Sequence, residues 1–309
     1  MTQPVIAITG PTASGKSALA DSLALELGTE VLSADAMQVY RGMDIGTAKT
    51  PVSQRRVPLR LVDLVDPTDS YSAALYQRDC RLLIDEFQSL GRAVILCGGT
   101  GLYIRAALDE MDFPSGEIDD ARRSKYQGLA ERLGPKGLHR LLEKVDPASA
   151  AVIHPNNVRR VVRALEMHDE GVSYAEQKTG FSDPRARYPH LLFALTMDRD
   201  RLYERIDNRV DAMIAEGLIQ EVTALVEAGA SEALTSRQAI GYKEIMDAFE
   251  GKCTMEEAIE AIKMRSRRYA KRQLSWCRRD ARTIWIDMDS HNVESACEFI
   301  LKQVGSFNG

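Results

Sequence analysis

The fold of this chain is decided by Gly10-Pro11-Thr12-Ala13-Ser14-Gly15-Lys16-Ser17, which follows the apolar run Val5-Ile6-Ala7-Ile8. The stretch has the pattern G-x-x-x-x-G-K-S, in which glycines let successive backbone N–H groups point into one concavity that attracts anionic oxygens. Lys16 adds a positive charge, Ser17 offers a hydroxyl to Mg²⁺, and the helix expected after them presents its positive N-terminus. The stretch therefore predicts a strand, a phosphate-binding loop and a helix, without saying which phosphate is bound.

Strand-like and helix-like patterns alternate near the start of the chain. Short apolar runs at residues 5–9, 30–33, 59–65 and 93–97 are typical of strands, and residues 16–27, 72–90 and 100–108 have helical patterns. This alternation predicts a doubly wound α/β fold, with a P-loop NTPase-like core and a mostly parallel sheet. Ligands of such sheets bind at the carboxyl ends of the strands, where the loops at residues 10–16, 34–49 and 98–101 are expected.

The pattern changes after Asp112, where Asp112-Phe-Pro-Ser-Gly116 interrupts the alternation. From there to about Arg187 the patterns are helical, without a convincing strand. Strand-like runs return at residues 191–197 and 283–286, with a long helix expected over residues 199–225. We therefore predict a catalytic core of residues 1–115 and 190–309, with an all-helical insertion domain at residues 116–189.

Composition and cysteine usage indicate a cytoplasmic protein. Of the 309 residues, 44% are hydrophobic and 28% charged, and no run of about 18 apolar residues suggests a membrane span. The N-terminus lacks the basic and apolar segments of an export signal. Five scattered cysteines without a C-x-x-C pair read as reduced thiols, rather than as a disulfide framework or zinc site.

A strongly basic segment stands out against the net charge of −5. Residues 263–282 hold nine Lys or Arg and one acid, Asp280, and they interleave the basic side chains with Tyr269 and Trp276. Basic groups neutralise phosphates, and aromatic rings stack on unpaired bases, so the segment is typical of an RNA-binding helix. A shorter basic helix is expected around Arg159. A solvated helix face remains the alternative for both.

Several polar residues fall at the expected ligand edge of the sheet. Asp35, after the second strand, can contact bound Mg²⁺, act as a base or cap a turn. Asp63 and Asp66 either end a second magnesium-binding strand or, as we favour slightly, begin the Asp66-Pro67 turn. Thr100 follows two glycines that permit close backbone approach to a ligand, and its hydroxyl either caps the next helix or points into the site.

An arginine stripe is expected on the helix that starts near residue 199. Arg201, Arg205 and Arg209 recur every four residues and so share one helix face. Such a stripe either pairs with nearby acids or supplies a guanidinium to a leaving anion.

Taken together, the motifs resemble those of the tRNA dimethylallyltransferase (tRNA isopentenyltransferase) family. Besides the phosphate loop, the matching segments are Asp35-Ala-Met-Gln-Val-Tyr40, Asp44-Ile-Gly-Thr-Ala-Lys49, Gly98-Gly-Thr-Gly-Leu-Tyr103, Asn157-Val-Arg-Arg-Val-Val-Arg-Ala-Leu-Glu166, Gln238-Ala-Ile-Gly-Tyr-Lys243 and Lys271-Arg-Gln-Leu-Ser-Trp276. They run in order from residue 10 to about 279. The departures are small: Ala36 stands where serine is frequent, and Thr50 where proline often follows the lysine.

The resemblance implies transfer of a dimethylallyl group from dimethylallyl diphosphate to N6 of adenosine 37, beside the anticodon of tRNA, with release of pyrophosphate. It implies Asp35 and Thr100 as catalytic residues, and a diphosphate site made of the eight loop residues and Arg209. Mg²⁺ on Ser17 is the expected cofactor, and no C-terminal zinc finger is expected. The chain is expected to act as a monomer.

The resemblance also implies a set of residues that grip the anticodon arm of tRNA. These are Asp35, Ala36, Met37, Gln38, Gly101, Arg123, Arg159, Arg160, Val161, Val162, Arg163, Arg237, Gln238, Ala239, Ile240, Gly241, Tyr242, Lys271, Arg272, Gln273, Leu274, Ser275, Trp276, Cys277 and Arg278.

Three other functions were weighed against this one. The phosphate loop alone fits the ATP site of a small-molecule kinase. An adenylate isopentenyltransferase would prenylate a free nucleotide, and it would need neither the basic segment nor the helical insertion. A nucleotide-switched RNA-binding protein would keep its function without Asp35.

Overall fold

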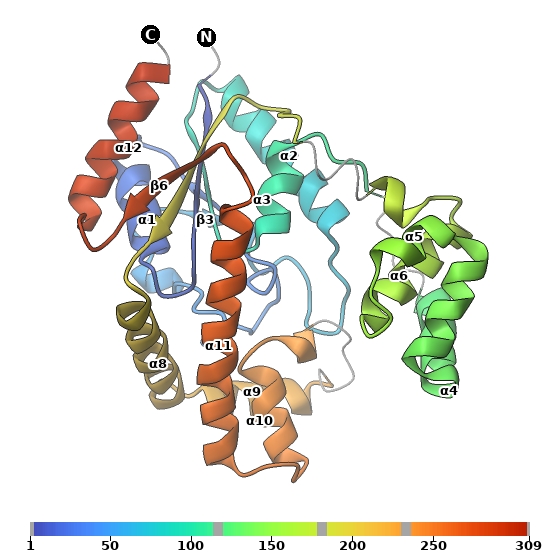
Figure 1. Ribbon diagram of the computed structural model, residues 1–309. Helices are drawn as coiled ribbons and strands as arrows, with labels where there is room; N and C mark the ends of the chain where they lie inside the picture. Colours follow the sequence, from blue (N-terminus) through green and yellow to red (C-terminus); the bar gives the residue numbers. More distant parts are fainter. Residues whose placement is uncertain (1–2, 114–119, 178–183, 230–235, 308–309) are drawn as a thin grey trace. The chain divides into compact units, whose positions relative to one another are not determined.

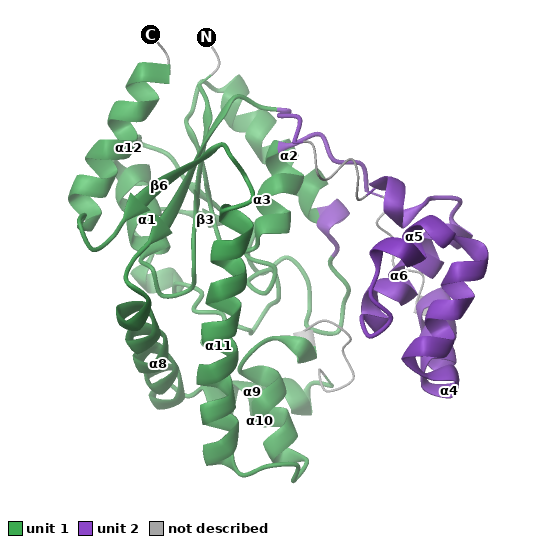
Figure 2. Cartoon of the chain, in the orientation of Figure 1, with its two compact units in different colours: residues 1–71, 76–108, 188–309 green, residues 72–75, 109–187 purple. Residues whose placement is uncertain are grey.

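The computed structural model describes residues 3–113, 120–177, 184–229 and 236–307 (Figure 1). The chain divides into two compact units (Figure 2). Unit 1 comprises residues 1–71, 76–108 and 188–309, and unit 2 comprises residues 72–75 and 109–187. The insertion expected from the sequence at residues 116–189 overlaps the long segment of unit 2, which begins at residue 109 and ends at residue 187.

Unit 1 is built on a six-stranded sheet in which every strand pair is parallel. Its order is β3-β2-β4-β1-β5-β6. The strands are β1 (Val5–Thr9), β2 (Val31–Ser33), β3 (Leu59–Arg60), β4 (Val94–Cys97), β5 (His190–Thr196) and β6 (Thr283–Asp287). The predicted α/β fold with a parallel sheet is confirmed. β3 is shorter than the run at residues 59–65, because Leu61 and Asp63 take positive φ angles of 62° and 55° that end the extended chain.

Helices pack on the faces of this sheet because its central strands β1 and β4 are mainly apolar and buried along their whole length. α1 (Lys16–Glu26) and α12 (Val293–Phe307) share a core with β1, β4 and β5, in which Leu19, Leu23, Phe193 and Ile300 are fully buried. Figure 1 shows α2 (Ala73–Ser89) and α3 (Gly101–Leu108) away from α1 and α12, beyond the central strands. Burying both faces is what an all-parallel sheet requires.

Helices α8 to α11 lie between β5 and β6 along the chain of unit 1. They are α8 (Arg199–Ala215), α9 (Leu218–Glu227), α10 (Tyr242–Phe249) and α11 (Met255–Cys277). The single helix predicted over residues 199–225 is wrong, because Gly217 adopts φ 106° and separates α8 from α9. α11 begins at a capping box formed by Thr254 and Glu257. It packs on α8 through Ala270, Leu202 and Ile206.

Unit 2 contains α4 (Asp120–Val145), α5 (Pro147–Val152) and α6 (Val158–Asp169). Their apolar faces enclose a separate core that includes Tyr126, Leu142 and Leu165. α4 is interrupted at Gly134, where φ is 68°, directly before Pro135. The structure also describes helical residues 174–177 and short 3₁₀ turns at Val52–Gln54 and Ser236–Gln238. Among the described helices, none combines the length and apolarity needed to cross a membrane.

Candidate active site

The loop between β1 and α1 has the curled backbone that its sequence predicts. Gly10, Ala13 and Gly15 all adopt positive φ angles, of 134°, 63° and 96°. A side chain at Gly10 would also collide with β5, because a Cβ there would lie 2.8 Å from the backbone oxygen of Leu195. Lys16 Nζ donates to the Pro11 oxygen at 2.6 Å, so the ammonium group is folded back over the loop.

The loop leaves donors available for an anion. The Thr12 N–H donates to Gln273 Oε1 at 2.9 Å, and the Ser14 N–H donates to the Pro11 oxygen at 3.3 Å. The N–H groups of Ala13, Gly15 and Lys16 have no hydrogen-bond partner among the residues described. The buried Ser14 hydroxyl is likewise unpartnered within the described chain. A diphosphate fits this donor set, and the oxygen of the exposed Ser17 hydroxyl could hold Mg²⁺ beside it.

Asp35 lies at the end of β2, close enough to act electrostatically on two cations. Burial lowers the pKa of Lys16 to about 8, and the neighbouring Arg209 lowers it further, whereas Asp35 opposes the shift. Burial also lowers the pKa of Arg209, again opposed by Asp35. The Asp35 Oδ1 accepts a hydrogen bond from the Met37 N–H at 2.9 Å. One carboxylate and two cations therefore converge beside the phosphate loop.

The Thr100 hydroxyl is directed toward the Asp35 loop. It accepts a hydrogen bond from the Ala36 N–H at 3.0 Å, and the Thr100 N–H donates to the Ala34 oxygen at 3.1 Å. Burial raises the pKa of Tyr269 on α11 to about 12; the Asp35 charge adds to the rise, and hydrogen bonds with Thr100 and Gln273 oppose it. Thr100 therefore connects the Asp35 loop to α11.

The glycines of the Gly98–Gly101 turn are needed for contacts inside the protein. A Cβ at Gly98 would lie 2.2 Å from the Ala34 oxygen, and one at Gly99 would lie 2.0 Å from Gln273 Nε2. At Gly101 it would lie 2.8 Å from the Trp276 ring. The sequence suggested an approach of backbone to ligand, whereas these three neighbours are Ala34, directly after β2, and two residues of α11.

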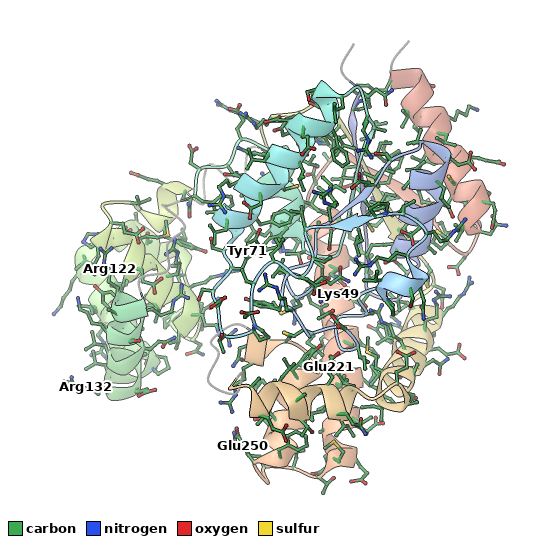
Figure 3. The ribbon with its side chains drawn as sticks, turned by 180° about the vertical axis from the view of Figure 1, so that it is seen from behind. Lys49, Tyr71, Arg122, Arg132, Glu221 and Glu250 are labelled. Atoms are coloured by element: carbon green, nitrogen blue, oxygen red, sulfur yellow. The ribbon has the colours of Figure 1, made fainter. Side chains whose placement is uncertain are left out.

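A second charged cluster surrounds Lys49, which is labelled in Figure 3. The Lys49 ammonium group is buried, and it lies 2.6 Å from carboxylate oxygens of both Asp44 and Asp63. Asp66 instead pairs with Arg41 at 2.8 Å, and its backbone oxygen accepts from the Asp69 N–H in a turn. Asp63 therefore forms an ion pair with Lys49, and Asp66 takes part in a turn.

Glu221 on α9 is a structural residue that sequence reasoning missed (Figure 3). Its carboxylate accepts hydrogen bonds from the N–H groups of Asp44, Ile45 and Gly46 at 3.0, 2.8 and 3.2 Å. The Tyr242 hydroxyl donates to the same carboxylate at 2.5 Å. The small Gly46, whose Cβ would lie 2.5 Å from the Tyr242 ring, was the available signal.

The basic residues of α11 divide into paired and outward-facing groups. Arg265 and Arg267 lie 2.5 Å from carboxylates of Glu244 and Asp207. In the predicted RNA-binding set on this helix, Lys271, Arg272, Trp276 and Arg278 are exposed, Leu274 and Ser275 are partly exposed, and Gln273 and Cys277 are buried. The helix therefore has an outer basic face and an inner face.

The arginine stripe of α8 does not act as one group. Arg201 pairs with Asp289 at 2.5 Å, and Arg205 Nε donates to the Ala13 oxygen at 2.8 Å. Arg209 is the member whose pKa responds to Asp35. The three arginines therefore lie on one helix, as the periodic pattern predicts, but each of them interacts with a different residue.

The other predicted RNA-binding residues lie in unit 2 and around α10. In unit 2, Arg159 and Arg160 are exposed, Val161 and Val162 are buried, and the buried Glu166 pairs with Arg123 at 3.0 Å and Arg163 at 3.3 Å. Around α10, Gln238 is exposed, Arg237 and Ile240 are partly exposed, and Ala239, Gly241 and Tyr242 are buried. Near Asp35, the residues Ala36, Met37 and Gln38 are partly exposed, as is Gly101 in α3.

The fold and the site define a P-loop α/β protein with a carboxylate at the end of its second strand. The chain belongs to the IPP transferase family, whose sequence model matches residues 38–280. It is 45% identical to the tRNA dimethylallyltransferase of Carboxydothermus hydrogenoformans, over all of this chain and 99% of the relative. It is 48% identical to that of Geobacillus kaustophilus, over 93% of this chain and 91% of the relative.

Similar solved structures support the same family. The tRNA isopentenylpyrophosphate transferase of Bacillus halodurans matches with a TM-score of 0.72 and 42% identity, over 98% of this chain and 97% of that one. A eukaryotic dimethylallyltransferase acting on tRNA matches with a TM-score of 0.76 and 30% identity, over 92% of this chain and 74% of that one. The resemblance noted in the sequence is therefore confirmed.

Proposed function

We propose that this chain transfers the dimethylallyl group of dimethylallyl diphosphate to N6 of adenosine 37 in tRNA and releases pyrophosphate. The observation that carries the proposal is the convergence of Asp35, Lys16 and Arg209 beside the phosphate loop. In the reaction, a bond forms between N6 and C1 of the prenyl group as the C1–O bond to the diphosphate breaks. The N6 proton passes to Asp35.

Asp35 suits the role of general base. An exocyclic adenine amine is a weak nucleophile because its lone pair is delocalised into the ring, so it needs a proton acceptor. Met37 holds one oxygen of the Asp35 carboxylate through its N–H group, and Thr100 holds the next peptide at Ala36. These two contacts support a fixed carboxylate, with Thr100 as the residue that orients the loop.

The phosphate loop suits a departing pyrophosphate. Negative charge grows on the diphosphate oxygens as the C1–O bond breaks, and preorganised donors stabilise such charge most effectively. Donors of this kind are Lys16, Arg209 and the loop N–H groups that have no partner in the described part of the chain. Ser17 would hold Mg²⁺, which neutralises diphosphate charge when bound.

The outer face of α11 suits an RNA substrate. Lys271, Arg272 and Arg278 are exposed for phosphate contacts, and the exposed Trp276 can stack on a base. The target adenine must leave the anticodon stack to reach Asp35, at a cost of about a few kcal/mol. We further propose that the remaining predicted residues that are exposed or partly exposed grip the anticodon arm, and that the protein acts as a monomer in the cytoplasm.

The proposal is tested by mass spectrometry of tRNA nucleosides. Unmodified tRNA is incubated with the protein, dimethylallyl diphosphate and Mg²⁺, then digested, and N6-dimethylallyladenosine is the expected product. A parallel reaction with adenosine 37 replaced by guanosine should give none. When ATP replaces the prenyl diphosphate, addition of tRNA should not increase the formation of ADP.

Two results would contradict the proposal. One is the absence of the prenylated nucleoside from reactions in which the protein binds both tRNA and pyrophosphate. The other is faster prenylation of free AMP than of tRNA, which would identify a nucleotide prenyltransferase.

A further inference from the structure

One buried side chain joins the two loops that form the diphosphate site. Gln273, on the inner face of α11, accepts a hydrogen bond from the Thr12 N–H at 2.9 Å and donates one to the Gly99 oxygen at 3.0 Å. Thr12 lies in the phosphate loop after β1, and Gly99 lies in the turn after β4. Gly99 is small enough for this contact, because a Cβ there would lie 2.0 Å from Gln273 Nε2.

The chemistry of this contact requires an amide. Gln273 is 6% exposed, so water does not readily replace a lost partner. Its carbonyl satisfies a backbone donor and its NH₂ group satisfies a backbone acceptor, both at once. A carboxylate of the same size would keep the acceptor, lose the donor and repel the Gly99 oxygen. A thioether of similar length would lose the donor and be a weak acceptor.

The neighbours of Gln273 connect the site to the RNA-facing side of the helix. Tyr269, one turn earlier, hydrogen-bonds with Thr100, and Lys271 and Arg272 are exposed. The Arg272 guanidinium lies 5.5 Å from the centre of the Tyr269 ring. The helix that carries the basic face is therefore held to the phosphate loop through Gln273.

We propose that Gln273 is a positioning residue for the diphosphate site, which fixes the phosphate loop by occupying its Thr12 N–H. The inference rests on the proposed function for the identity of the anion. Holding Thr12 leaves the N–H groups of Ala13, Gly15 and Lys16 for the ligand and sets their direction. Gln273 thus acts on the diphosphate through the loop, without touching it.

The test compares Gln273→Glu with the wild type, using Mg²⁺ and inorganic pyrophosphate as the probe. At pH 8 the variant is expected to bind pyrophosphate about 10- to 100-fold more weakly, because a buried acceptor loses its donor. As pH falls, the introduced carboxyl is protonated. It then donates its O–H to Gly99 and accepts from Thr12, as the amide does. Burial raises the pKa of such a carboxyl above its ordinary value of about 4.3, whereas the Thr12 N–H lowers it, so affinity is expected to recover as pH falls from about 8 toward 5.

The ratio of variant to wild-type affinity is the measured quantity, since it cancels the protonation of pyrophosphate itself. Gln303→Glu, on α12, adds the same charge away from the loop and is expected to keep a ratio near one at every pH. A Gln273→Glu ratio that does not change with pH, or that equals one at pH 8, overturns the proposal.

A second variant, which adds no charge, separates loss of the donor from direct repulsion of pyrophosphate, and it keeps the test decisive if Gln273→Glu does not fold. Gln273→Met is expected to weaken pyrophosphate binding at all pH values while tRNA binding changes little, and normal pyrophosphate affinity overturns the proposal. Failure of the proposed function would give a different result from failure of the positioning role. In that case wild-type protein would bind pyrophosphate and depend on Gln273, yet it would not prenylate tRNA.

Discussion

Lys16 and Asp35 act on each other across the end of β4. Lys16 begins the helix after β1, Asp35 follows β2, and β4 lies between these two strands in the sheet. Burial pushes the pKa of Lys16 down to about 8, and the negative charge of Asp35 limits the fall. The cation expected to bind the diphosphate therefore loses its proton within an experimentally accessible pH range.

Diphosphate binding is expected to weaken as pH rises above about 8. In the free protein Lys16 is charged below this pKa, and a bound anion favours the charged form and raises its pKa. Binding should therefore take up about half a proton at pH 8, and about 0.9 proton at pH 9 if the pKa returns to its ordinary value. Calorimetry of pyrophosphate binding in buffers of different ionisation enthalpy measures this uptake.

The control for this prediction is Lys16→Arg, whose guanidinium stays charged over the whole range. The difference in proton uptake between the two proteins removes the contribution of the ligand. If the two proteins take up equal numbers of protons at pH 9, the titrating group is not Lys16.

Replacing Asp35 by Ala or Asn is expected to slow prenyl transfer by orders of magnitude and spare tRNA binding. General-base catalysis contributes about 10²- to 10⁴-fold, so single-turnover transfer should slow by that factor. Asn keeps the size of the side chain and its acceptor for the Met37 N–H, so the loop is retained. Asp69→Asn, in an exposed turn, is the matched control. Transfer within twofold of wild type in Asp35→Asn would remove Asp35 as the base.

The parts of the fold that the sequence predicted are those set by local pattern. The apolar run at β1 and the phosphate loop are contiguous, so their residues fix both strand and site. Contacts between distant segments were invisible: Glu221 holds Gly46 from 175 positions away, and Gln273 holds Thr12 from 261. The break at Gly217 was missed because the helical pattern continues on both sides of it.

The glycine turn is a second case in which the sequence did not reveal contacts between distant segments. Gly98 to Gly101 were recognised as a place of close approach, and that much was correct. Which partner approaches is a property of tertiary packing, and here the partners are Ala34, Gln273 and Trp276. A glycine motif therefore shows that a small residue is required, but it does not show which neighbouring residue leaves no room for a side chain.

Glu221→Ala is expected to destabilise unit 1 and to impair the Asp35 loop. The variant leaves three backbone N–H groups of residues 44–46 and the Tyr242 hydroxyl without their acceptor. Losing charge-assisted hydrogen bonds of this kind costs about 1–3 kcal/mol in the free energy of unfolding. Urea denaturation measures it, with Glu227→Ala on the exposed side of α9 as the control. Equal stability of both variants would show that the carboxylate is not a structural cap.

Neutralising Arg272 and Arg278 is expected to weaken tRNA binding and leave pyrophosphate binding unchanged. Arg272 on α11 and Arg278 at its C-cap are both exposed, whereas the loop contacts come from the buried Gln273. Each lost phosphate contact should reduce the slope of log affinity against log salt by about 0.7–0.9. Binding is measured from 50 to 300 mM salt, with Arg60→Gln/Arg199→Gln as the control because both residues are exposed and lie outside α11. An Arg272→Gln/Arg278→Gln variant with an unchanged slope would show that this face does not contact the phosphates of tRNA. Loss of pyrophosphate affinity in the same variant would instead indicate a displaced helix.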